Sequence, residues 1–330
     1  MTPKERLHAA LSGQAVDRTP LTPIFMAWAA HAVGHTYRDY YLDHHVMVKA
    51  QLAVTQRFGL DQISSISDPW RESSAFGMQL DYPPEGVGIP QKHLLEDMAA
   101  AYHLQPYDPL VAPRTSDRIK AVTQLVHAVG STHSVLGWVE GAMAEYADLR
   151  GVELACLDLL DEPDAFHAAA KVIVDCAIHF AELQIKEGAD VIGIGDAAAS
   201  LIGPELYVQH VLPWEQILIT AIHDRGAKVK LHICGNITSI IPAMATSGAD
   251  IIDVDYVLPL AQARQLAGPN VCLAGNFNPT AVLLQGTPAI VRSTALQCIK
   301  DAGPRFILQP GCEVPPGTAV ENIEAFCQAV

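Results

Sequence analysis

The chain has 330 residues, half of them hydrophobic, and a formal net charge of −15 at pH 7. This composition allows a large buried core, and an α/β barrel of this size commonly forms one domain, so we expect a single domain over residues 1–330. The 21 Lys and Arg residues form no dense basic run, which argues against nucleic acid as a partner.

The N-terminal residues, Met1-Thr2-Pro3-Lys4-Glu5-Arg6-Leu7, are charged and typical of a helix, and no apolar signal region follows them. Nowhere do eighteen apolar residues run together, so we expect a cytoplasmic protein that does not contact a membrane. The seven cysteines are an odd number without a disulfide framework, which fits a reducing compartment. Five of them are expected to be small buried hydrophobic residues: Cys156, Cys176, Cys272, Cys298 and Cys327.

Eight short apolar or β-branched runs bounded by turn residues are predicted to be strands. In chain order they cover about 21–26, 61–67, 134–139, 190–195, 228–234, 250–255, 271–276 and 305–310. Helical stretches separate most of them; for example, apolar residues recur at helical spacing from Glu205 to Arg225 before Gly226 ends the helix. Strands and helices that alternate in this way require a parallel sheet.

Three of the predicted strands follow a glycine-alanine pair that stops the preceding helix: Gly188-Ala189, Gly226-Ala227 and Gly248-Ala249. Eight strands in 330 residues, with no Gly-x-Gly-x-x-Gly after the first, favour a (β/α)8 TIM barrel over an open doubly wound sheet. We expect an N-terminal helical extension and, from about 70 to 130, a long insertion after strand two.

Potential metal ligands follow two of the predicted strands. His232 and Cys234 lie two residues apart on one extended segment, so their side chains point to the same side, and Cys312 follows the last strand. In a barrel, the carboxyl ends of all strands meet at one face. Each of the three residues alone would more often be structural, but two cysteines and a histidine at that face together predict a zinc site. Such a set leaves one tetrahedral position free, which indicates a catalytic metal.

Two carboxylates are candidates for the fourth ligand or for another catalytic role. Glu140 comes first because Gly137-Trp138-Val139-Glu140 places a carboxylate at the end of an apolar strand, where an unpartnered charge is costly. Asp196 comes second, after the next predicted strand. Hydrogen bonding to loop amides or to substrate is the alternative role for either residue.

Further polar residues at the strand ends have less specific roles. Asp253 and Asp255 share one strand face, and they either orient His232 or cap a loop. Candidate substrate contacts, chosen on position alone, are Tyr207, Asn236 and Asn276.

Short motifs along nearly the whole chain match a known family. They are Thr2-Pro3-Lys4-Glu5-Arg6, Asp17-Arg18-Thr19-Pro20, Ala147-Asp148-Leu149-Arg150-Gly151, Pro204-Glu205-Leu206-Tyr207, Leu212-Pro213-Trp214, His232-Ile233-Cys234-Gly235-Asn236, Gly248-Ala249-Asp250-Ile251-Ile252, Gly275-Asn276-Phe277-Asn278-Pro279, Gly311-Cys312-Glu313-Val314-Pro315 and Glu321-Asn322. On these motifs the chain resembles the uroporphyrinogen decarboxylase superfamily, and in particular its zinc-dependent, corrinoid-linked methyltransferase branch.

The decarboxylases of that superfamily carry an arginine-rich segment after the first strand and a histidine at the position of Cys312. Here the first predicted strand leads into Phe25-Met26-Ala27-Trp28, with no arginine before Arg38. The methyltransferase branch has His-x-Cys and a distant cysteine as zinc ligands, which His232, Cys234 and Cys312 match. The resemblance therefore implies a TIM barrel whose zinc activates a thiol, such as coenzyme M, for methyl transfer from a methyl-corrinoid.

The resemblance also implies methylcobalamin or a corrinoid protein as the methyl carrier. No Asp-x-His-x-x-Gly corrinoid-binding stretch occurs in the chain, so we expect a separate corrinoid protein as partner and a small-molecule thiol or methyl donor as substrate. The oligomeric state stays open, a homo-oligomer included.

Three other functions stay open from the sequence. One is a lyase for a carboxylated substrate, which needs a basic pocket for which Arg38, Arg71 and Arg150 are the main candidates. The second is a non-catalytic barrel that binds a corrinoid or thiol. The third is a demethylase that passes the methyl group of a donor such as a methyl ether to a corrinoid protein.

Overall fold

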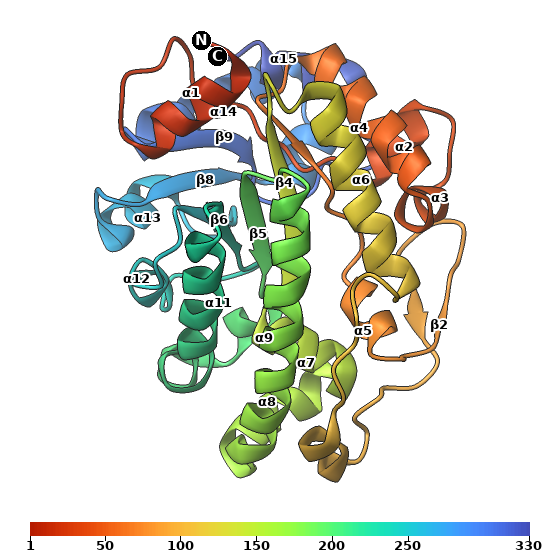
Figure 1. Cartoon of the computed structure of the whole chain (residues 1–330). Helices are drawn as coiled ribbons and strands as arrows, with labels where there is room; N and C mark the ends of the chain where they lie inside the picture. Colours follow the sequence, from red (N-terminus) through yellow and green to blue (C-terminus); the bar gives the residue numbers. More distant parts are fainter.

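The computed structural model describes all 330 residues, and its centre is a curled parallel sheet (Figure 1). The seven strands are adjacent in chain order: β1 (Gln62–Ser64), β4 (Ser134–Glu140), β5 (Val191–Gly195), β6 (Lys228–His232), β7 (Ile251–Val254), β8 (Cys272–Phe277) and β9 (Phe306–Pro310). Every neighbouring pair in this sheet is parallel. The α/β class and the parallel sheet predicted from the sequence are therefore confirmed.

The strand predicted at 21–26 is the exception. Leu21 forms a single parallel bridge with Leu308 of β9, and no strand extends from it. Pro20 and Pro23 flank this bridge, and proline has no backbone N–H to continue a ladder of hydrogen bonds. The first predicted strand is thus reduced to one bridging residue.

Residues 20–22 nevertheless lie between the two edge strands of the sheet. On one side they exchange two backbone hydrogen bonds with Leu308, of 2.9 and 3.3 Å. On the other side the Leu21 carbonyl accepts a hydrogen bond of 2.9 Å from the backbone N–H of Asp61, just before β1. This segment therefore connects the edges of the curled sheet.

Most helices follow a strand and cover the outer face of the sheet; α6, α9 and α11 stand side by side in Figure 1. The helices between strands are α6 (Pro113–Val129), α7 (Ala142–Arg150), α8 (Val152–Asp161), α9 (Pro163–Lys186), α10 (Gly203–Leu206), α11 (Leu212–Asp224), α12 (Ile241–Met244), α13 (Leu260–Ala267) and α14 (Pro288–Ala302), and α15 (Val320–Cys327) follows the last strand. Shorter helical segments are η2 (Ala197–Leu201), η3 (Tyr207–Val211) and η4 (Pro279–Leu284). None of the helices combines the length and apolarity that a bilayer crossing needs.

The predicted insertion at 70–130 is shorter than expected. Its first part holds α5 (Arg71–Ala75), the two-residue strands β2 (Leu80–Asp81) and β3 (Ile89–Pro90), and η1 (Met98–His103). The last part is α6, which buries Ile119, Val122 and Leu125 along one face and serves as the crossover between β1 and β4. Only the part before α6 is therefore additional to the strand–helix alternation.

The expected N-terminal helical extension is α1 (Pro3–Leu11), and α2 (Ala27–Ala32), α3 (Tyr37–Leu42) and α4 (His44–Phe58) follow before β1. Leu7 and Leu11 of α1 belong to a small buried cluster with alternate residues of the strands, among them Leu136 and Ile307. A much larger cluster packs the sheet against the outer helices. Helix α1 thus covers the inner side chains of the sheet at one end of the strands. The carboxyl ends of the strands, with their polar residues, lie at the other end.

Candidate metal centre

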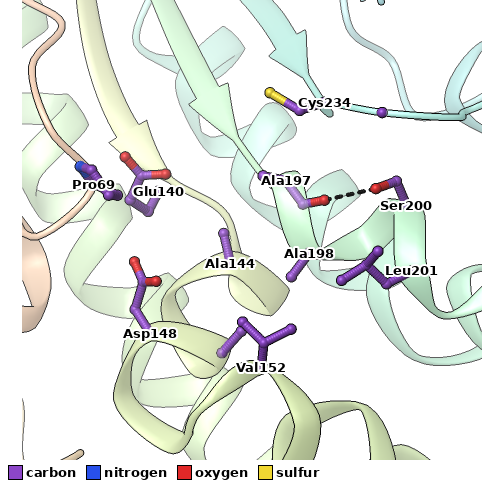
Figure 2. A pocket seen from close by; sticks show the side chains of 12 residues that line it. Pro69, Glu140, Ala144, Asp148, Val152, Ala197, Ala198, Ser200, Leu201 and Cys234 are labelled. Atoms are coloured by element: carbon purple, nitrogen blue, oxygen red, sulfur yellow. Dashed lines mark hydrogen bonds between the residues drawn. The ribbon is translucent and has the colours of Figure 1, made fainter. Parts of the chain in front are cut away.

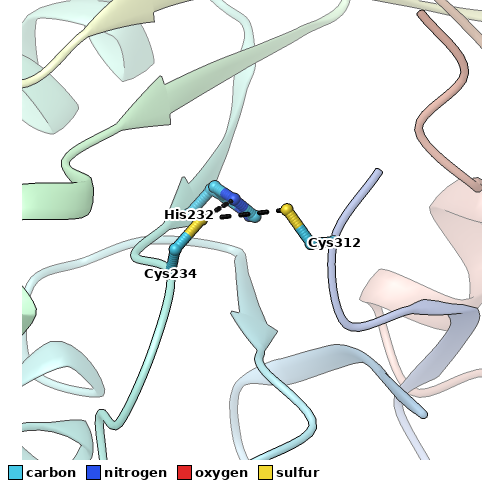
Figure 3. A group of neighbouring side chains, drawn as sticks. All are labelled: His232, Cys234 and Cys312. Atoms are coloured by element: carbon cyan, nitrogen blue, oxygen red, sulfur yellow. Dashed lines mark hydrogen bonds between the residues drawn. The ribbon is translucent and has the colours of Figure 1, made fainter. Parts of the chain in front are cut away.

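Three potential ligands converge where β6 and β9 end (Figure 3). His232 is the last residue of β6, Cys234 follows two residues later, and Cys312 comes two residues after β9. The Nε2 atom of His232 lies 2.9 Å from the Cys234 sulfur, which lies 3.9 Å from the Cys312 sulfur. All three ligand atoms are within 4.8 Å of one another. Side chains 78 positions apart in sequence thus meet at one point.

The sulfur–sulfur distance fits a tetrahedral zinc ion, whereas the His232 Nε2 atom, 2.9 Å from the Cys234 sulfur, would have to move outward to the roughly 3.6 Å that such a site needs. With Zn–S bonds of 2.3 Å, two sulfur ligands are roughly 3.8 Å apart, and the two cysteine sulfurs are separated by 3.9 Å. His232 is buried and both cysteines are half-buried, so the ligands lie at the border between core and solvent. Two thiolates and one imidazole would hold the ion and leave a fourth position for a substrate atom.

The ring of His232 is held by the neighbouring strand. Its Nδ1 atom lies 2.7 Å from Oδ2 of Asp253 in β7, so the Nδ1–H group donates to the carboxylate and Nε2 faces the cysteines. The other oxygen of Asp253 lies 3.2 Å from the buried ammonium of Lys230, which also donates to Gln309. Burial alone would raise the pKa of Asp253, but Lys230 and His232 lower it, so the carboxylate stays charged.

The two cysteine sulfurs are joined by a hydrogen bond. The pKa of Cys312 is lowered to about 4, chiefly because the Cys234 thiol donates a hydrogen bond to its sulfur. The same hydrogen bond, together with burial, raises the pKa of Cys234. Burial disfavours a charged His232, but the cysteine sulfur and Asp253 raise its pKa well above the usual range. A soft cation would displace these protons and gain two thiolates and an imidazole.

The turn after Cys234 is fixed by a second carboxylate. Oδ2 of Asp255 accepts a hydrogen bond of 2.7 Å from the backbone N–H of Gly235. Gly235 has φ +88°, a conformation that favours glycine. Of the two roles considered for the aspartate pair, Asp253 therefore orients His232, and Asp255 holds the loop.

The two predicted catalytic carboxylates do not join the group of ligand atoms within 4.8 Å. Oε1 of Glu140 accepts from Arg71 at 2.6 Å and from the Trp138 indole at 3.1 Å. Oδ1 of Asp196 accepts from the backbone N–H of Ala144 at 2.6 Å, and this side chain is fully buried. One oxygen of each carboxylate thus has a partner inside the protein, and the second oxygen of Asp196 is buried without one. A catalytic or fourth-ligand role for either residue stays a prediction.

A cavity of about 370 Å³ opens beside Cys234 (Figure 2). Its walls come mainly from α7 and η2, and most are small and apolar. The lining residues are Pro69, Glu140, Ala144, Ala147, Asp148, Val152, Ala197, Ala198, Ser200, Leu201, Cys234 and Gly235. The volume is in the range of small-molecule sites. Glu140 thus faces the same cavity as Cys234, from the far wall.

The three predicted substrate contacts are not among the lining residues. Tyr207 is fully buried and donates a hydrogen bond of 2.6 Å to Glu215. The amide of Asn276 donates to the carbonyls of Asp255 and Leu258, so it supports the loop after β7. Asn236 is exposed, and its Oδ1 atom caps the turn at residue 238.

Asp148 is a cavity residue that the sequence analysis did not select. It lies inside α7, away from any strand end, so the rule that polar groups gather at strand ends does not find it. The sequence does contain a pattern that could have indicated Asp148. Ala144, Ala147 and Asp148 have helical spacing, which places a carboxylate on a helix face of small residues.

Residues 2–330 match the model of a family described as Uroporphyrinogen decarboxylase (URO-D). The methylcobamide:CoM methyltransferase MtbA of Methanosarcina mazei is 29% identical over 333 residues, which cover 98% of this chain and 96% of that protein. A uroporphyrinogen decarboxylase of Coxiella burnetii is 27% identical over 350 residues, which cover 99% and 94%.

Solved structures agree with this fold. A methyltransferase from Methanosarcina mazei superposes with a TM-score of 0.90 at 24% identity and covers 100% of this chain and 98% of its own. A putative vitamin-B12-independent methionine synthase from Listeria monocytogenes has a TM-score of 0.59 at 13% identity, and the match covers 94% of both chains. At these identities the likeness shows the fold: a curled parallel sheet covered by helices.

Proposed function

The chain belongs to the uroporphyrinogen decarboxylase family, and from that premise we propose that it is a zinc-dependent methyltransferase. It moves a methyl group between a corrinoid, either methylcobalamin or a corrinoid protein, and a thiol or similar acceptor. The observation that carries the proposal is the convergence of His232, Cys234 and Cys312 beside a cavity of small-molecule size. The full-length similarity to a methylcobamide:CoM methyltransferase supports it.

The cavity argues against a lyase for a carboxylated substrate. Such an enzyme needs basic side chains around its substrate, and none of the lining residues is Arg, Lys or His. Arg71 is held by Glu140 and Glu72, at 2.6 and 3.3 Å. Arg150 is held by Asp158 at 2.7 Å and by two backbone carbonyls. Two of the arginines that the sequence offered for a basic pocket are therefore already paired inside the protein.

The ligand set suits alkyl transfer to sulfur. A Zn²⁺ ion held by two thiolates and a neutral imidazole would lower the pKa of a substrate thiol in its fourth position while leaving the sulfur nucleophilic. Asp253 keeps the His232 ring in place, and Lys230 keeps Asp253 charged. The small apolar residues of α7 and η2 limit water around the reacting sulfur.

The corrinoid partner must approach from outside, because a cavity of about 370 Å³ accepts a thiol but not a corrin ring. Val152 and Leu201 line the cavity and are 49% and 63% exposed, so they offer apolar contacts at its mouth. We propose that a separate corrinoid protein docks there. We further propose that residues 20–22 complete an eight-stranded (β/α)8 barrel and that residues 1–330 form one domain.

Metal analysis followed by an absorbance assay tests the function. We expect about one zinc per chain and a thiol-dependent loss of methylcobalamin in the presence of the zinc-loaded protein. Equal activity in protein freed of zinc by a chelator would overturn the proposal. Thiol binding without loss of methylcobalamin would instead favour a carrier or sensor, and methylation of cob(I)alamin by a methyl ether would favour the demethylase direction.

A further inference from the structure

We propose that the cavity beside Cys234 selects a thiol substrate with a cationic or uncharged head group and rejects one with a sulfonate or carboxylate. This inference rests on the proposed function, because it names the class of thiol that the same site takes. The charged residues that line the cavity are Glu140 and Asp148, and both are acidic. Ser200 adds one hydroxyl, and the other walls are apolar or glycine apart from Cys234.

Asp148 has no partner within the protein. Its carboxylate makes no hydrogen bond and no ion pair, and it extends from α7 into the cavity toward Glu140 (Figure 2). Burial, and after it the negative charges of Glu140 and Glu72, raise the pKa of Asp148 well above its usual range. A raised pKa means that this carboxyl group keeps its proton to higher pH while it has no partner, and a cationic ligand would lower that pKa and pair with the ionised group.

The wall behind the cavity contributes further acidic groups. Glu72 and Glu140 share the guanidinium of Arg71. Glu145, one turn before Asp148 on α7, accepts a hydrogen bond from Ser73, and its second oxygen is buried without a partner. The neighbouring Arg114 is paired with Asp68 and does not offset these groups. Of these four acidic residues, only Glu72 and Glu140 are paired with Arg71, and Glu145 and Asp148 have no cationic partner.

The position of Glu140 and Asp148 in the cavity determines which part of a substrate they would contact. Cys234 lies at one side of the cavity, and Glu140 and Asp148 lie across from it (Figure 2). A thiol whose sulfur occupies the metal side must direct its head group toward the two acidic residues. An ammonium head group would replace the protons that these carboxyl groups hold and form ion pairs with them, and a hydroxyl group would exchange hydrogen bonds with them. A sulfonate or carboxylate head group would meet two acidic groups and no cation.

Three thiols with the same two-carbon chain test this inference on the zinc-loaded protein: 2-aminoethanethiol, 2-mercaptoethanol and 2-mercaptoethanesulfonate. We expect kcat/KM for methylcobalamin loss to be at least about tenfold higher for the amine than for the sulfonate. The alcohol is expected to lie between them. A higher kcat/KM for the sulfonate would overturn the inference.

Calorimetric binding of the S-methyl thioethers of the three compounds separates head-group selection from thiol acidity and from methyl transfer. We expect the ammonium thioether to bind tighter than the sulfonate thioether by about tenfold. If this order holds while no thiol consumes methylcobalamin, the head-group selection stands and the proposed reaction fails. No measurable binding of the ammonium thioether, or tighter binding of the sulfonate, overturns the selection itself.

The Asp148→Asn variant assigns the effect to this side chain, because it keeps the shape and removes the group that can ionise to pair with an ammonium. We expect it to reduce the ammonium-over-sulfonate ratio severalfold in both measurements. The matched control is Asp161→Asn at the end of α8, where the carboxylate is exposed and away from the cavity lining. An unchanged ratio in Asp148→Asn, with the thermal unfolding curve preserved, contradicts the proposal.

Discussion

The two sides of the cavity differ in what their polar side chains are bound to. At the end of β6, the second nitrogen of His232 is bound by Asp253, and this leaves Nε2 facing the two sulfurs. At the end of β4, the Glu140 carboxylate is instead held by Arg71 at 2.6 Å. Both positions are strand ends at the same edge of one sheet, so position alone does not decide which residue binds metal. A strand-end residue can bind a metal ion only if one of its ligand atoms has no hydrogen-bond or ion-pair partner in the protein apart from the other ligands.

The difference extends to charge. On the side of Cys234, Lys230 and Asp253 form a buried ion pair that supports the histidine, and the two cysteine sulfurs lie 3.9 Å apart. On the other side, carboxyl groups outnumber their arginine partner, and burial raises the pKa of Glu140 to about 7. One side therefore offers a candidate metal site, and we propose that the other meets the polar end of a small ligand.

The largest expected effect comes from removing a free ligand atom. The Cys312→Ser variant should lose zinc and at least about 1000-fold of kcat/KM, because a single thiolate and a histidine bind zinc weakly. Metal content by plasma mass spectrometry and the methylcobalamin assay measure the two losses. Cys156→Ser on α8 is the control, since this half-buried thiol lies away from the ligand group and should keep both properties. Full zinc content in Cys312→Ser would show that another residue completes the site.

The second expected effect is smaller, because Asp253 orients a ligand without binding the metal itself. The Asp253→Asn variant should weaken zinc binding about 10- to 100-fold, since the amide no longer fixes the His232 tautomer as a carboxylate does. Competition with a chromogenic chelator measures the affinity. Asp250→Asn, just before the same strand, is the matched control, because Asp250 pairs with His223 and Lys228 away from the site. Equal affinities for the two variants would mean that His232 needs no support from Asp253.

The sequence predicted most of the fold because the apolar runs of buried parallel strands are local signals. Seven of the eight predicted strands are present, and the missing one depends on a tertiary bridge between Leu21 and Leu308. The length of the insertion was overestimated because Tyr82-Pro83-Pro84 and Tyr107-Asp108-Pro109 indicate loops, and the residues after them were counted with these loops. Those residues form α6, which packs on the sheet as an ordinary crossover helix. The pattern of residues within one segment does not predict which distant segment it will contact in the folded chain.

The convergence of His232, Cys234 and Cys312 could also be predicted, because they are rare residue types at strand ends. The carboxylates could not be assigned in the same way. Glu140 was expected to need a partner, and Arg71, 69 residues earlier in the chain, meets it only through the fold. Tyr207 points into the core toward Glu215 in the same way, although its position after β5 suggested a substrate contact. Roles that depend on a distant partner thus appear only in the structure.

The smallest expected effect concerns the carboxylate side, and it is a change in stability with pH. Glu145 is buried with one oxygen unpartnered, and burial followed by the charges of Asp148 and Glu72 raises its pKa well above the usual range. The folded state therefore binds this proton more tightly than the unfolded state, and stability falls as pH rises above the unfolded pKa of about 4.3. Glu145→Gln cannot titrate and keeps an acceptor for Ser73, so the variant should be more stable than the parent at pH 7 by on the order of 1 kcal/mol. The stability difference between the variant and the parent should shrink toward pH 4.

Urea unfolding at several pH values measures this difference. Glu153→Gln, which replaces an exposed glutamate on α8, is the control and should leave the pH profile unchanged. A Glu145→Gln profile parallel to that of the parent would show that Glu145 meets a cation or solvent in the folded state, and the excess of negative charge behind the cavity would then be smaller than inferred.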